Sequence, residues 1–110
     1  MKKVEIWAGK VVNAYTFVEL ELLCTVGKKA QDLWYEEWKN QGGKDEGTCC
    51  GGKAIRVYFI PKGKRKVEEV PIAACSWVQG NISASKSVAP ALAYLAQMGI
   101  EAEYYDGWMD

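Results

Sequence analysis

The chain has 110 residues, a length that suits one domain with a single modest core. Its 14 basic and 14 acidic side chains give a formal net charge of zero, so no global field draws the protein to nucleic acid or anionic lipid. The sequence has no histidine, the usual general base and the commonest metal ligand near neutral pH. A binding role is therefore favoured over catalysis, and we expect no catalytic residue, metal or cofactor.

The longest apolar runs, at residues 70–74 and 88–93, are far shorter than the ~20 residues of a membrane span. The first residues also lack the apolar core of a signal peptide. We therefore expect a cytoplasmic protein with no membrane partner, formed by one domain over residues 1–110.

Four cysteines follow neither a secreted disulfide framework nor paired zinc-binding spacing, and we expect them to be reduced. Cys24 and Cys75 lie in apolar segments and are predicted to be buried. Cys49 and Cys50 lie in a glycine-rich loop, where the alternatives are an inert connection and an oxidisable or metal-binding pair.

Two strands are predicted at the start of the chain. Residues 3–12 are rich in β-branched and aromatic side chains and are broken at Gly9-Lys10, which favours a turn or bulge there. Residues 14–26 alternate between an apolar and a mixed set with a period of two, which favours a second strand over a helix.

The next segment predicts an amphipathic helix followed by a hairpin. Residues 28–41 have apolar side chains at spacings of three and four, and Gly42-Gly43 ends the pattern. Residues 54–60 and 66–77 form the two arms of the hairpin around a Pro-Lys-Gly-Lys turn. Pro71 cannot donate a ladder hydrogen bond, so the second arm must be interrupted, bulged or at an edge.

A last helix and a last strand complete the chain. Ser85 or Ser87 is expected to cap the helix, Pro90 fits its first turn, and Gly99 ends it. Its apolar stripe consists of Val88, Leu92, Leu95 and Met98. Residues 100–105 form the short final strand.

Without the first strand, the order of elements is β-α-β-β-α-β. This is the order of ferredoxin-like folds, in which two helices cover one face of an antiparallel sheet. The predicted fold is therefore α+β and ferredoxin-like, with an extra N-terminal strand. Such a fold does not determine a function.

Residues 47–54 nearly match the phosphate-binding pattern G-x-x-x-x-G-K-[ST]. The match fails because Ala54 replaces the hydroxyl residue, and because Lys53 leads into a strand pattern and not into a helix. We expect a connection here and not a nucleotide site.

The sheet face away from the helices is the main candidate site. The predicted strands place on it two carboxylates, an arginine and several aromatic rings: Tyr15, Phe17, Glu19, Glu21, Arg56 and Tyr58. Because aromatic residues and arginine are common interface anchors, we expect a homodimer through this face and a small organic ligand near it. The alternative is a solvated face with scattered aromatic rings.

Two other functions remain open. A cluster of basic residues lies at the hairpin turn: Lys62, Lys64, Arg65 and Lys66. The cluster either contacts nucleic acid or forms a solvated tip. A small enzyme would use Glu19 or Glu21 with a tyrosine as its acid-base set.

The aromatic, acidic segment 103–110 either anchors a partner or folds back on the core through Trp108.

Overall fold

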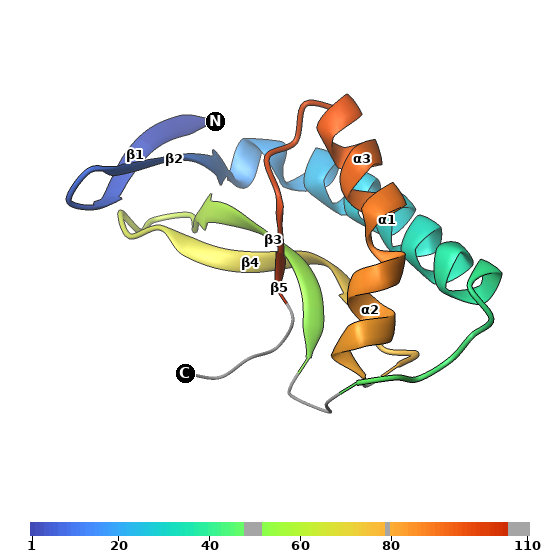
Figure 1. Ribbon diagram of the computed structural model, residues 1–110. Coiled ribbons are helices and arrows are strands. Elements are labelled where there is room, and N and C mark those ends of the chain that lie inside the picture. The colour runs from blue at the N-terminus through green and yellow to red at the C-terminus, as the bar shows by residue number, and fades with distance from the viewer. Residues whose placement is uncertain (48–51, 79, 106–110) are drawn as a thin grey trace.

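The chain begins with a β-hairpin in the computed structural model, which describes residues 1–47, 52–78 and 80–105 (Figure 1). Strand β1 (Lys2–Trp7) pairs antiparallel with β2 (Lys10–Thr16), and the turn between them includes Gly9 at φ 81°. The break predicted at Gly9 is thus a reversal of the chain. The second strand starts there and runs on to Thr16.

The prediction of a strand over residues 14–26 is wrong beyond Thr16. A short 3₁₀ turn, η1 (Phe17–Glu19), leads into the long helix α1 (Leu20–Asn40), which covers the predicted helix 28–41 except for its last residue. The Thr16 backbone N–H donates a hydrogen bond of 3.0 Å to the Glu19 carboxylate, one half of a capping box. This local signal starts the helical region earlier than the hydrophobic alternation suggested.

Side-chain exposure explains the error. The alternation depended on Val18, Leu20 and Leu22, but these side chains are exposed in the structure. The buried positions of α1 are spaced by one, three or four residues: Leu23, Val26, Gly27, Ala30 and Trp34. That spacing is helical.

The predicted hairpin is confirmed as β3 (Lys53–Ile60) and β4 (Glu68–Cys75). The register shifts between Ile55 and Arg56, so that Ile55 faces Ala73 while Arg56 faces Pro71. Pro71 therefore lies beside a β-bulge on an edge strand, where a missing N–H is tolerated. The Gln31 side chain accepts the Ala74 backbone N–H at 3.0 Å, which further blocks this edge against pairing.

The last helical region is two helices, α2 (Asn81–Ser87) and α3 (Ala89–Gln97). The predicted cap at Ser85 or Ser87 is wrong, because both serines lie inside α2. Pro90 is in the first turn of α3, as predicted. The chain then ends its described part with β5 (Glu103–Tyr105), which is shorter than the predicted strand 100–105.

The described residues form a mixed sheet of five strands, and the ferredoxin-like order is not confirmed. Strand β2 runs parallel to β3, and the helix α1 connects them as in a β-α-β unit. Strand β4 pairs with one edge of β3 along 53–59, so both β2 and β5 must use the other edge. They lie end to end there, β2 at residues 59–60 and β5 at 54–56.

The helices gather on one side of the sheet and enclose the core (Figure 1). The core side chains come from α1, α3 and the inward positions of β3 and β4, and include Leu23, Trp34, Ile55, Val57, Ala73 and Leu95. Met98, expected on the buried stripe of the last helix, is 49% exposed. Within the described residues, no helix is long and apolar enough to cross a membrane.

Candidate functional site

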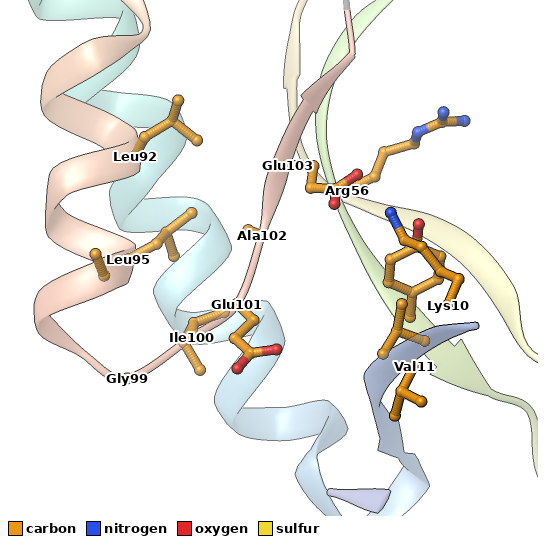
Figure 2. Close-up of a pocket in the computed structure, with 13 residues that line it drawn as sticks. Lys10, Val11, Arg56, Leu92, Leu95, Gly99, Ile100, Glu101, Ala102 and Glu103 are labelled. Carbon is orange, nitrogen blue, oxygen red and sulfur yellow. The ribbon is translucent and has the colours of Figure 1, made fainter. Parts of the chain in front are cut away.

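The divided edge of β3 creates a cleft in the molecule. Because β2 and β5 each pair with only a few residues of β3, a gap opens between the β1–β2 hairpin on one side and β5 with α3 on the other. Figure 2 shows this space, with Val11 on one wall and Leu95 and Ile100 on the opposite one. The cleft has a volume of about 680 Å³, within the range of ~300–1,000 Å³ that is usual for small-molecule sites.

Hydrogen bonds join the two walls next to the cleft. The Glu101 backbone N–H donates to the Tyr15 hydroxyl at 2.9 Å, and the Asn13 side-chain amide donates to the Glu101 carboxylate at 2.7 Å. Burial raises the pKa of Tyr15, which the Glu101 backbone hydrogen bond partly offsets. Tyr15 is therefore a protonated, buried phenol that fixes the segment before β5 to β2.

The cleft is lined by both apolar and polar side chains. The apolar side chains that line it are Val11, Val12, Leu92, Leu95, Ala96, Ile100 and Ala102. The polar ones are Lys10, Arg56, Tyr58, Glu101 and Glu103. Such a lining suits an organic molecule with an apolar body and a polar group.

Two of the polar side chains continue onto the open face of the sheet. Along β3, Ile55 and Val57 point into the core, so Arg56 and Tyr58 point to the opposite face. The Arg56 guanidinium forms a salt bridge of 2.7 Å with Glu69 and lies 3.7 Å from the ring centroid of Tyr105. Burial raises the pKa of Tyr58, and its hydrogen bond with the Glu69 carboxylate adds to this.

The candidate face predicted from the sequence is therefore divided. The structure keeps Arg56 and Tyr58 together, and both line the cleft. Tyr15 is buried beside it, whereas Phe17 and Glu21 lie on η1 and α1. These positions differ because the strand expected over residues 14–26 is largely a helix.

The acid-base set of the enzyme alternative is also not assembled in the cleft. The Glu19 carboxylate binds the amino-terminal ammonium group of Met1 and caps η1. Glu21 is exposed on α1, and neither carboxylate lines the cleft. Within the described residues, no group of three or more histidine, cysteine, aspartate or glutamate side chains could hold a metal ion.

Sequence reasoning missed Lys10, Glu69, Glu103 and Tyr105 as members of this region. Only the position of Glu69 had a local signal, since the predicted hairpin brings 66–77 beside 54–60. Lys10 and Glu103 join the site through the pairings of β2 and β5 with β3, which connect distant parts of the chain.

The near-match to a phosphate-binding loop leads into a strand, as expected. Lys53 is the first residue of β3, is buried, and does not begin a helix. Residues 48–51, including Cys49 and Cys50, lie outside the described residues, and so does the segment 106–110 with Trp108.

The two cysteines that the structure describes differ sharply. Cys75 is buried, as predicted, but Cys24 is exposed on α1, so the prediction of a buried Cys24 is wrong. It failed because the helical phase turns position 24 away from the core, between Leu23 and Val26. Burial raises the pKa of the Cys75 thiol to about 11.

This difference predicts selective alkylation. With iodoacetamide at about pH 8, Cys24 should be modified quickly in the folded protein while Cys75 is protected, since the thiolate is the reactive form. A thiol with this raised pKa holds about 100-fold less thiolate than a thiol with the ordinary pKa of 9.0. Peptide mapping by mass spectrometry measures both sites, and denaturant should abolish the difference. Equal rates in the folded protein would contradict the buried position of Cys75.

Comparison with known proteins gives no relative from which a function could be transferred. No family model matches the chain, and no curated protein or solved structure matches it either.

Proposed function

We propose that this protein is a small binding protein that holds a small organic ligand in the cleft between β2, β5 and α3. The observation that carries the proposal is that Arg56 and Tyr58, two residues expected at a ligand site, line a cleft of about 680 Å³. The apolar lining side chains would remove the body of the ligand from water, and the polar ones would orient it.

The charged side chains that line the cleft are Lys10 and Arg56 with Glu101 and Glu103, so an anionic group of a ligand must be met by a cation that no carboxylate already pairs. Arg56 is already paired with Glu69, and Glu101 accepts a hydrogen bond from Asn13. Lys10 lies 5.4 Å from the ring centroid of Trp7 and, within the described residues, makes no ion pair. Its ammonium group is therefore the cation best placed to meet a carboxylate or sulfonate.

Self-association through the open sheet face stays a prediction. Of the residues predicted for this interface, Arg56 and Tyr58 lie on the face, with Arg56 paired to Glu69 and stacked on the Tyr105 ring, whereas Tyr15 is buried and Phe17 lies on η1. A dimer formed there would have a polar interface. Light scattering after size-exclusion chromatography measures the mass that decides between monomer and dimer.

The cleft proposal is tested with anilinonaphthalene sulfonate, a fluorescent dye with an aromatic body and one anionic group. Ala96 is exposed on α3 and lines the cleft, so Ala96→Phe should fill part of the cleft and weaken dye binding by about tenfold or more. Ala93 is exposed on the same helix but does not line the cleft, which makes Ala93→Phe the matched control. The measurement is a fluorescence titration, with circular dichroism to verify helix content.

Charge recognition has its own variant in the same titration. Lys10→Gln should weaken binding of the dye, and Lys29→Gln, an exposed lysine on α1, should not. If the parent binds no dye, or if Ala96→Phe and Ala93→Phe have equal effects, the cleft is not the binding site.

A further inference from the structure

The tip of the β3–β4 hairpin is the most concentrated patch of positive charge in the sequence. Four of the 14 basic residues lie in the turn between the two strands, Lys62, Lys64, Arg65 and Lys66, and all are exposed. In Figure 1 this turn projects from the sheet on the side away from the helices. The patch is independent of the cleft, because none of its residues lines the cleft.

Two acidic side chains on the segments that adjoin this tip have other partners. Glu69 forms a salt bridge with Arg56 on the sheet face, and Glu19 binds the amino terminus of Met1. Within the described residues, none of the four basic side chains at the tip forms an ion pair. Exposed Glu68 is then the carboxylate that remains next to the turn in sequence, so the tip keeps a positive local field although the whole chain is neutral.

An exposed aromatic ring lies directly beside this charge. The parallel pairing of Thr16 with Ile60 places η1 next to the hairpin turn. Phe17 follows Thr16, is 51% exposed, and has the Lys62 ammonium 5.2 Å from its ring centroid. The sequence separates Phe17 from the basic turn by more than 40 residues, and the fold brings them together.

We infer that the basic tip and Phe17 together form a contact surface for single-stranded nucleic acid. Lysine and arginine would meet the phosphates, and the half-exposed ring of Phe17 offers a face on which an unpaired base can stack. A single strand fits better than a duplex, because the bases of a duplex are already stacked on one another. Because the rest of the chain carries the balancing negative charge, we expect weak binding without strong sequence preference.

The test is a fluorescence-anisotropy titration of the full chain with labelled oligothymidylate at several salt concentrations. The logarithm of the binding constant should fall with the logarithm of salt concentration, with a slope of about −0.7 per phosphate contact. The triple variant Lys64→Gln/Arg65→Gln/Lys66→Gln should lose about tenfold or more in affinity and reduce the magnitude of the slope by about 2. A matched triple variant elsewhere, Lys28→Gln/Lys29→Gln/Lys86→Gln, removes the same charge from exposed helical positions and should retain most of the affinity.

Phe17→Ala separates stacking from charge. It should weaken binding by about fivefold or more without changing the salt slope, because stacking of one base does not release counterions. Three results would overturn the inference: no binding at low salt, equal losses in the two triple variants, or full affinity in Phe17→Ala. Tip-dependent binding to phosphatidylserine vesicles without binding to the oligonucleotide would also overturn it and would assign the patch to anionic lipid.

Discussion

Replacement of Gly27 by alanine should destabilise the protein by about 3 kcal/mol, although the same change usually stabilises a helix. In an exposed helix interior, alanine is better than glycine by about 1 kcal/mol. Gly27 is buried in α1 against β4, and a Cβ atom at this position would lie 2.1 Å from the backbone oxygen of Ile72. Since a backbone carbonyl cannot rotate away as a side chain can, the helix or the strand must move, and the packing around both is lost.

Thermal unfolding followed by circular dichroism measures this effect. For a domain of this size, the loss corresponds to a decrease in Tm of roughly 12 °C. Cys24→Ala is the control, because Cys24 is exposed on the same helix and its removal should change Tm little. A Gly27→Ala variant as stable as the parent would mean that α1 does not approach β4 this closely.

The sequence predicted those elements whose pattern is local. The hairpin of β3 and β4 followed from the alternation of Ile55 and Val57 and from the turn at Gly63, and the structure confirms it. Pro71 has no N–H to donate to the ladder, and the bulge beside it interrupts the ladder at that point. The bulge also allows Val70 and Ala73 to face the core although they are an odd number of residues apart.

The start of α1 could not be predicted from hydrophobic spacing alone. Large apolar side chains at Val18, Leu20 and Leu22 produce a period of two, yet the structure leaves them exposed. Their exposure is a tertiary property, set by which side of α1 meets the sheet. The capping pair Thr16 and Glu19 was the local signal that competed with the alternation.

The candidate site shows the same division between local and long-range information. Arg56 and Tyr58 were predicted together because they alternate along one strand. The cleft beside them depends on β2 and β5 sharing one edge of β3, and no local pattern determines that arrangement. The approach of Phe17 to Lys62 depends on the same parallel pairing of β2 with β3.

Replacement of Trp34 by alanine should cost about 3–5 kcal/mol, because it empties the centre of the core. Trp34 is fully buried, and its indole N–H donates to the Ala84 carbonyl and to the Ser87 hydroxyl at 3.1 Å each. Its ring also makes edge-to-face contacts with Trp77 and with Tyr104 of β5, at centroid distances of 5.7 and 5.8 Å. The variant therefore loses apolar burial, a hydrogen-bonded link to α2, and support for β5.

Chemical denaturation measures the loss, and hydrogen exchange shows where it acts. Trp38→Ala is the matched control: Trp38 is one turn further along α1 and half-buried, and its indole N–H donates to the Lys44 carbonyl at 2.8 Å, so its removal should cost clearly less. Because Trp34 contacts Tyr104 of β5, Trp34→Ala should also reduce the hydrogen-exchange protection of the β5 amides more than that of the β1–β2 hairpin. Equal losses of stability in the two tryptophan variants would contradict the central position of Trp34. Unchanged protection of β5 would mean that this strand, and the cleft wall with it, is held by its pairing with β3 and not by the core beneath it.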